Sequence, residues 1–316
     1  MTDGGRSSPS LERILRELGA PDLVARLGRD LGGADLTTLQ MAVAAERAAG
    51  MDASRLLRRY EEDRFVRPGL APSLRLREVE DAYLRAVPEG SEWLTPSPLV
   101  PLGTHAALGG VSQDRLVTTV RMTEVAADPT AALALEAAAR RRRTSRRRTD
   151  PPLRLASFQR VTRAQRFVEE AAFAHFELFA LVTAGRSQPR GGFDAPALLE
   201  HLRVHVSALA GAVVDGVRIV LSVPDDGPGA TLLDATSSAF SGAQAVTVVH
   251  DPERLPSQRY YQRACFKVHA TFGASTFEVA DGGFTDWTER LLADRHERLL
   301  TSAAGLDRVA LALDGG

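Results

Sequence analysis

The chain has 316 residues, of which 44% are hydrophobic and 25% are charged, and its formal net charge is -1. This balance excludes a disordered or strongly basic chain, so charge gives no reason to expect non-specific nucleic-acid binding. A single cysteine, Cys265, excludes an internal disulfide, and no apolar run resembles a membrane span or a signal peptide. We therefore expect a cytoplasmic protein without membrane association.

The first part of the chain has the pattern of a small helical unit. Apolar residues between 11 and 60 recur at helical spacing, and the Pro and Gly residues at 67–72 are typical of a linker. We predict an N-terminal helical unit over residues 1–68 and a larger domain over residues 69–316.

Periodicity in the larger domain predicts a succession of strands among helices. Helical spacing predicts helices at 74–87, 131–139, 196–209 and 289–300. Runs rich in branched and aromatic residues predict strands at 116–120, 158–161, 176–182, 217–223, 245–249, 264–270 and 275–280. The sequence Asp281-Gly282-Gly283 predicts a turn that ends the last of these strands.

Two clusters of polar residues have competing interpretations. His201 and His205 have the i, i+4 spacing that can hold a metal ion, but a solvated helix face is the simpler interpretation, and we assign no metal site. The basic run Arg140–Arg148 is typical of a solvated loop or helix end, with contact to RNA phosphates as the alternative.

Three separated segments form one pattern that could carry chemistry. The segments are Arg163-Ala164-Gln165 with Phe176 after a charged loop, Arg259-Tyr260-Tyr261 with Asp281-Gly282-Gly283 and Asp286, and Gly305-Leu306-Asp307-Arg308. A planar guanidinium can hold two phosphate oxygens at once and stabilise charge that develops at phosphorus. The simpler alternatives are a surface hairpin for Arg163, a salt bridge for Glu278 and a helix cap for Asp286.

These segments, in this order, resemble the class II aminoacyl-tRNA synthetases, and in particular histidyl-tRNA synthetase. The Arg163 segment resembles motif 2 of that family, the Arg308 segment resembles motif 3, and Trp93-Leu94-Thr95-Pro96 resembles motif 1, the dimerisation element. The resemblance spans about residues 74–313. It implies an α+β fold in which an antiparallel sheet is flanked by helices, and it implies a homodimer.

The resemblance also implies roles for individual residues. Arg163 and Arg308 would be catalytic and would bind ATP, used together with Mg²⁺. Gln165, Phe176 and Glu278 would complete the nucleotide site, although Gln165 stands where the family has Glu. The implied substrate-binding residues are Arg121, Glu124, Arg259, Tyr260, Tyr261, Gly282, Gly283 and Asp286. Glu124 is displaced by one position from the family pattern, which argues against histidine as the substrate.

Two functions are compatible with this resemblance. The first, which we prefer, is ATP-dependent activation of an amino acid or another small carboxylic acid as an acyl-adenylate. The acyl group would then pass to a small molecule, a carrier protein or RNA. The alternative is a non-catalytic, ligand-sensing subunit similar to the regulatory subunit of ATP phosphoribosyltransferase. The sequence ends soon after motif 3, so we expect no anticodon-binding domain.

Overall fold

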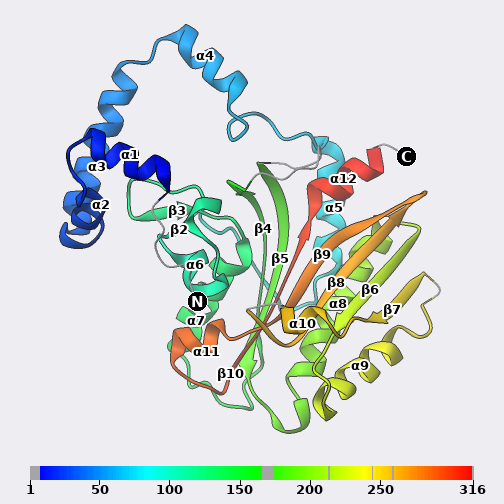
Figure 1. Cartoon of the computed structure of the whole chain (residues 1–316). Helices are drawn as coiled ribbons and strands as arrows, with labels where there is room; N and C mark the ends of the chain where they lie inside the picture. Colours follow the sequence, from blue (N-terminus) through cyan, green and yellow to red (C-terminus); the bar gives the residue numbers. More distant parts are fainter. Residues whose placement is uncertain (1–7, 166–173, 213, 244, 258–259, 315–316) are drawn as a thin grey trace. The chain divides into compact units, whose positions relative to one another are not determined.

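The computed structural model describes residues 8–165, 174–212, 214–243, 245–257 and 260–314. The chain divides into two compact units, one formed by residues 1–62 and 119–123 and the other by residues 63–118 and 124–316 (Figure 1).

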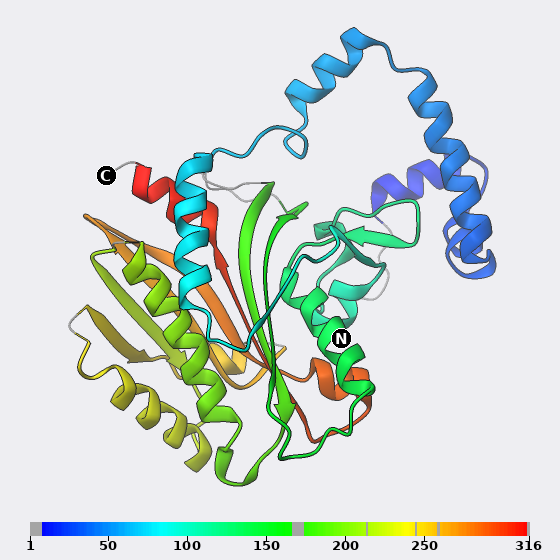
Figure 2. The ribbon, with the colours of Figure 1, turned by 180° about the vertical axis from the view of Figure 1, so that it is seen from behind.

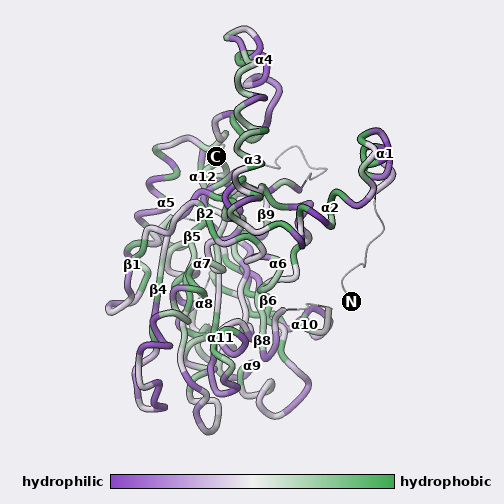
Figure 3. Tube along the Cα trace, turned by 90° about the vertical axis from the view of Figure 1, so that its left-hand side faces the viewer, coloured by the Kyte–Doolittle hydropathy of each residue, from purple (hydrophilic) through white to green (hydrophobic). Residues whose placement is uncertain are grey.

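The first unit is mainly helical. Its helices are α1 (Pro9–Glu17), α2 (Leu23–Ala25), the π-helix η1 (Arg26–Asp30), α3 (Gly33–Ala49) and α4 (Ala53–Glu62). Ser8 caps α1, because its side chain accepts a hydrogen bond from the backbone N–H of Leu11 at 3.2 Å. None of these helices contains a buried residue, and polar and apolar positions alternate along them (Figure 3).

The second unit contains an eight-stranded sheet in the order β1-β4-β5-β10-β9-β8-β6-β7. The strands of this sheet are β1 (Glu92–Leu94), β4 (Leu153–Thr162), β5 (His175–Arg186), β6 (Gly216–Ser222), β7 (Val246–His250), β8 (Tyr261–Phe272), β9 (Ser275–Thr285) and β10 (Glu297–Gly305). A separate two-stranded sheet pairs β2 (Leu99–Pro101) with β3 (Thr123–Val125). The large sheet is antiparallel through its centre, but β1–β4 and β6–β7 pair in parallel at its two edges. The predicted α+β fold is therefore confirmed, with a mixed sheet.

Helices cover both faces of this sheet. The helices of the second unit are α5 (Ser73–Ala86), α6 (Thr104–Gly109), η2 (Gln113–Arg115), α7 (Pro129–Arg142), η3 (Pro189–Gly191), α8 (Asp194–Gly211), α9 (Gly227–Phe240), α10 (Arg254–Ser257), α11 (Trp287–Leu292) and α12 (Leu306–Asp314). Along β5, Phe179 and Leu181 join a core with α5, α8 and α12, whereas Ala180 and Val182 join a second core with α7 and α11. We call the face beneath α5 and α8 the back face, and the face beneath α7 and α11 the front face (Figure 2).

Three local predictions are wrong. Residues 116–120 form no strand, although Thr118 makes an isolated bridge to Glu124. The helix predicted at 289–300 ends at Leu292, and β10 begins at Glu297. Two leucine pairs in this region imitate helical spacing, but Leu299 faces the front core and Leu300 the back core, which is the alternation of a strand.

The predicted turn at Asp281-Gly282-Gly283 is also absent, because β9 continues through these residues. Both glycines are needed for close approach. A Cβ on Gly282 would lie 2.5 Å from Phe266 Cζ, and a Cβ on Gly283 would lie 2.6 Å from Tyr261 Cδ1. The two glycines therefore allow neighbouring side chains to pack directly against β9, and they do not form a turn.

Candidate functional site

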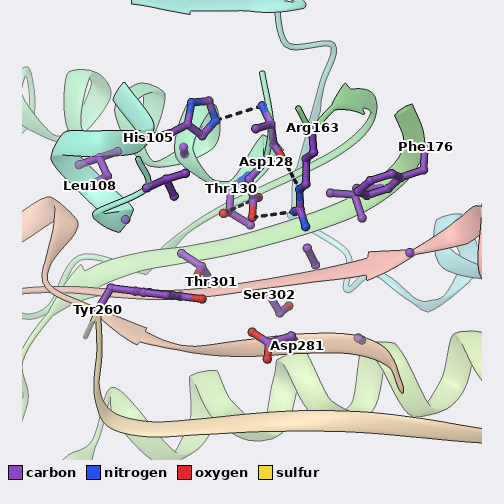
Figure 4. Close-up of a pocket in the computed structure, with 18 of the residues that line it drawn as sticks. His105, Leu108, Asp128, Thr130, Arg163, Phe176, Tyr260, Asp281, Thr301 and Ser302 are labelled. Carbon is purple, nitrogen blue, oxygen red and sulfur yellow. Dashed lines mark hydrogen bonds and ion pairs between the residues drawn. The ribbon is translucent and has the colours of Figure 1, made fainter. Parts of the chain in front are cut away.

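A cavity of about 670 Å³ lies against β8, β9 and β10 and is bounded by α6, α7, α11 and α12 (Figure 4). Its described lining residues all belong to the second unit. Seven residues predicted from sequence line it together: Arg163, Gln165, Phe176, Tyr260, Tyr261, Glu278 and Arg308.

Arg163, just after β4, is held by three groups. Its Nε donates a hydrogen bond to the carbonyl oxygen of Ala127 at 2.9 Å, and its guanidinium carbon lies 5.1 Å from the ring centroid of Phe176. One terminal nitrogen lies 3.9 Å from the Asp128 carboxylate. The guanidinium is thus fixed by its Nε edge and one ring face, which leaves N–H donors on its terminal nitrogens for a ligand.

Arg308 reaches the cavity from the first turn of α12. Its side chain is exposed and donates a hydrogen bond to the carbonyl oxygen of Glu278 at 2.8 Å. The Glu278 carboxylate pairs with Lys267, the only lysine in the chain. The neighbouring Asp307 is buried and accepts hydrogen bonds from the backbone N–H of Glu177 at 2.6 Å and from Arg160 at 3.3 Å. Asp307 therefore anchors the β10–α12 junction; both residues line the cavity, and Arg308 is the exposed one.

Tyr260, Tyr261 and Trp287 form an aromatic wall. The ring centroids of Tyr260 and Tyr261 are 4.4 Å apart, and those of Tyr260 and Trp287 are 6.2 Å apart. Tyr261 donates a hydrogen bond to Asp281, which is also paired with Arg254. Burial, reinforced by the Asp281 charge, raises the pKa of Tyr260 to about 12, so its hydroxyl stays protonated at neutral pH.

Glu124 is buried and does not line the cavity. It accepts hydrogen bonds from the backbone N–H groups of Gly103 at 2.9 Å and His105 at 3.0 Å, and from the Gln113 amide at 3.0 Å. Burial alone would raise the pKa of Glu124, but these hydrogen bonds lower it to about 2, so the carboxylate stays charged. In this structure the Glu124 carboxylate holds the backbone at residues 103 and 105, and it does not occupy the place beside the substrate that the sequence predicted.

Glu124 instead fixes His105, which does line the cavity. His105 Nδ1 lies 2.7 Å from a Glu124 oxygen, and its Nε2 lies 3.1 Å from the backbone nitrogen of Ala127. Nε2 must accept from that N–H, so the proton of the neutral ring is on Nδ1 and is donated to Glu124. Because the Ala127 carbonyl holds Arg163, a chain of contacts runs from Glu124 to the guanidinium.

Sequence reasoning missed His105, Asp128 and Asp281. Asp128 is the N-cap of α7, where one oxygen accepts from the backbone N–H of Thr130 at 2.9 Å and from its hydroxyl at 2.7 Å. The Asp-Pro-Thr sequence is a helix-start signal that could have identified it. Asp281 was hidden by its assignment to a turn.

The remaining predicted site residues that the structure describes are not among those that line the cavity. Gly282 and Gly283 are packed within β9, and Asp286 pairs with Arg290 at 2.9 Å without capping α11 through its side chain. Arg121 is an exposed residue of the first unit, and Arg259 lies outside the described residues.

The donor set does not fit a metal site held by the protein. Among the described residues, no three or more His, Cys, Asp or Glu side chains gather closely enough to hold a metal ion. The two cavity carboxylates on β9 are already paired, Glu278 with Lys267 and Asp281 with Arg254.

Solved structures of low sequence identity share this fold, whereas no protein-family model and no curated protein matches the chain. A Bacillus halodurans protein described as an ATP phosphoribosyltransferase regulatory subunit/histidyl-tRNA synthetase is 14% identical, with a TM-score of 0.58 over 81% of this chain and 83% of that one. Apo histidyl-tRNA synthetase from S. aureus is 10% identical, with a TM-score of 0.56 over 76% and 69% of the two chains. A histidine–tRNA ligase subunit from Alicyclobacillus acidocaldarius is 15% identical, with a TM-score of 0.56 over 79% and 96%.

The fold of the chain is therefore similar to that of the histidyl-tRNA synthetase core. This confirms the fold that the three motifs predicted, although identities this low establish the fold alone. Within the described part of this synthetase-like chain, no helix is long and apolar enough to cross a membrane.

Proposed function

We propose that the cavity binds ATP through Arg163 and Arg308 and activates a small carboxylic acid as its adenylate. One observation carries the proposal: two arginines, from the end of β4 and the start of α12, line the same cavity. Both guanidinium groups have N–H donors beyond their contacts to backbone carbonyls, and such donors match phosphate oxygens.

The reaction would be an in-line displacement at the α-phosphorus. A carboxylate oxygen of the acid attacks phosphorus, the new C–O–P linkage forms, and the bond to the leaving pyrophosphate breaks. Arg163 and Arg308 would offset the negative charge on the phosphates during this step. Asp128, beside Arg163, is placed to pair with an amine if the acid is an amino acid. The acceptor of the acyl group would be a small molecule, a carrier protein or RNA.

Exchange of labelled pyrophosphate into ATP, measured with a panel of amino acids and other small acids, tests this proposal. We expect exchange that depends on at least one acid. The proposal fails if no acid supports exchange and ATP does not bind.

A ligand-sensing subunit without catalysis is the second candidate. Two observations favour it: Glu278 and Asp281 are already paired with cations, and Gln165 supplies a neutral amide where the family has a carboxylate. The Bacillus halodurans relative carries the name of a regulatory subunit as well as that of a synthetase. Tight binding of an acid, in the absence of any exchange, would favour this candidate over the enzyme.

We also propose that the protein forms a homodimer through the segment that resembles motif 1. Within the chain, Trp93 of β1 packs against Phe158 and Phe179, with ring centroids 5.0 and 6.0 Å apart, so this segment is part of the folded core. Leu74 and Leu84 of the neighbouring α5 remain exposed. Sedimentation of a monomer at micromolar concentration would refute the dimer.

A further inference from the structure

We infer that the basic run at the end of α7 is a docking surface for the acidic face of another protein. Four exposed arginines form this surface, here called the arginine patch: Arg142, Arg143, Arg147 and Arg148. None of them is among the residues that line the cavity, so the inference goes beyond the proposed reaction and does not rest on it.

Three other arginines of the same run fix the segment to the fold. Arg141 is buried and holds the Glu297 carboxylate through two nitrogens, at 2.5 and 3.1 Å. Arg140 pairs with carboxylates of β1 and α7. Arg146 lies 3.7 Å from the Asp294 carboxylate and has the left-handed conformation, with φ at 49°, that a non-glycine residue keeps only when its surroundings hold it there. The run is therefore divided into arginines that anchor the chain and arginines that do not.

Hydrogen bonds also fix the backbone of the patch. The Asp150 carboxylate accepts from the backbone N–H of Arg147 at 2.7 Å and from the Ser145 hydroxyl at 3.2 Å. The carbonyl oxygen of Arg148 accepts from the Gln188 amide at 3.1 Å. The patch side chains therefore extend from an ordered backbone, which lowers the entropy that a partner must remove on binding.

The rest of the chain does not use these four guanidinium groups. Among the described residues, none of the four side chains makes a hydrogen bond or an ion pair. The partial negative charge at the end of α7 favours Arg142 and Arg143, but Arg147 and Arg148 follow the helix and gain nothing from it. Like charges this close in sequence repel one another, so the patch lowers the stability of the isolated chain. A partner outside the chain accounts for a cluster that the fold does not need.

The chemistry of the patch matches clustered carboxylates. A guanidinium forms two parallel hydrogen bonds with a carboxylate or with a phosphate, so an acidic protein and RNA are the partners to compare. Residues 140–150 contain no aromatic side chain on which bases could stack, and the formal net charge of the chain is -1. RNA-binding surfaces instead combine stacking rings with a broad excess of positive charge.

The size of the patch favours a protein as well. Carboxylates at residues 92, 136, 150 and 294 border it and confine the positive charge to a short segment. A confined arginine cluster suits an acidic patch on a protein, because arginine is enriched at protein interfaces and charge complementarity there selects the partner.

Fluorescence anisotropy of a labelled decaglutamate peptide, titrated with the full-length protein, tests the inference. An oligouridylate of the same length is the competing probe, because it carries a similar charge on phosphates. We expect the peptide to bind more tightly than the oligouridylate, and its affinity to fall as the salt concentration rises.

The double change Arg147→Ser and Arg148→Ser removes two patch charges beyond the helix. It should weaken peptide binding by about tenfold, and chemical denaturation should show a variant at least as stable as the parent, since repulsion is relieved. The matched control is the pair Arg58→Ser and Arg59→Ser, adjacent exposed arginines of α4 for which the structure describes no ion pair and whose loss alters the net charge equally. The control should change the peptide affinity by less than about twofold.

Four results would overturn the inference. The peptide could fail to bind, or the patch variant and its control could weaken binding equally, which would show attraction to net charge alone. A patch variant less stable than the parent would assign Arg147 and Arg148 to the fold. Tighter binding of the oligouridylate, with the same loss in the patch variant, would identify RNA as the partner and refute an acidic protein. These measurements contain no ATP and no small acid, so an absence of pyrophosphate exchange leaves them unaffected.

Discussion

The two faces of the sheet differ in how fully their polar side chains are hydrogen-bonded. Behind the sheet, a buried chain of hydrogen bonds joins five residues from α5, α8, β5 and β10: Tyr83, His205, Ser302, His201 and Thr183. One set of donors and acceptors satisfies the whole chain, because each group can donate to the next until Thr183 reaches Glu200 at 3.5 Å. In front of the sheet, Arg163 keeps terminal N–H donors that no described group accepts in a hydrogen bond, the Asp128 carboxylate being 3.9 Å away.

This contrast separates structural from functional polar residues. A saturated network stabilises one packing arrangement and has nothing left to offer a ligand. An unsaturated group at a cavity wall can bind one. The chemistry of this protein is therefore expected in front of the sheet, although two of the three buried histidines among the described residues, His201 and His205, lie in the back network.

His205→Leu should give the largest effect on stability. The change leaves the Tyr83 hydroxyl without its 3.2 Å partner and Ser302 without the donor at 2.9 Å. Two unsatisfied buried groups should lower the free energy of unfolding by about 3 kcal/mol. Chemical denaturation measures this, with His250→Leu on exposed β7 as the control that should change by less than about 0.5 kcal/mol. Equal effects of the two changes would show that the back network contributes nothing.

Arg163→Ala and Arg308→Ala should weaken ligand binding and leave stability nearly unchanged. Each change removes a charge-assisted contact to the nucleotide, so ATP binding should weaken by about 1.5–3 kcal/mol. The free energy of unfolding should change little, because the two side chains are partly or fully exposed. Titration calorimetry measures the ATP affinity of the folded variants, and chemical denaturation measures their free energy of unfolding. If both variants bind ATP as tightly as the parent, the nucleotide does not bind in this cavity.

The back network should also make stability depend on pH. Burial lowers the pKa of His205 from 6.5 to about 3, and burial with the His205 charge lowers the pKa of His201. Both rings are neutral in either state above pH 6.5. Below it, the unfolded chain binds protons that the folded chain excludes, so unfolding becomes easier by up to about 1.4 kcal/mol per pH unit for each ring.

Glu177 has the opposite effect on stability as pH falls, so the contribution of His205 must be measured by comparing the parent with the variant. Burial raises the pKa of Glu177 to about 7, and this carboxyl makes folding more favourable as pH falls from 7 towards 4.5. The difference between the parent and His205→Leu, measured by denaturation between pH 7.5 and pH 5, isolates the His205 contribution. A constant difference over that range would show that His205 is not held neutral.

The histidines also show where sequence reasoning stops. The spacing of His201 and His205 correctly places them on one face of a helix, but it does not tell which way that face points. The interpretation as a solvated face is wrong, since both side chains are completely buried against Ser302. The partner that decides this, Ser302, lies about a hundred residues away on a strand whose register no local pattern encodes.

The residues of the cavity also fall into those that sequence patterns could identify and those that depend on the tertiary structure. Arg163, Phe176 and Arg308 were predictable because motifs with a fixed order identify them, and the structure brings them to one cavity. His105 and Asp128 were not found, because the way that α6 and α7 dock on the sheet decides that these side chains line the cavity. Glu124 carries the right charge for a ligand, but its hydrogen bonds to the backbone of residues 103 and 105 show that it serves the fold.

Asp286→Asn should give the smallest effect, and it tests whether a front-face position alone confers function. Asp286 precedes α11, where its carboxylate pairs with Arg290 and makes no capping hydrogen bond. Arg290 also donates to the carbonyl oxygens of Ala107 and Leu108, so it stays anchored without the ion pair. The loss should be below about 1 kcal/mol, as for other exposed i, i+4 pairs, and the affinity for an amine-bearing acid should be unchanged. A large loss of that affinity with normal stability would instead show that Asp286 contacts the substrate, as its motif implied. Measuring denaturation and ligand binding on the same variant decides between these outcomes, because a structural ion pair and a ligand contact affect different quantities.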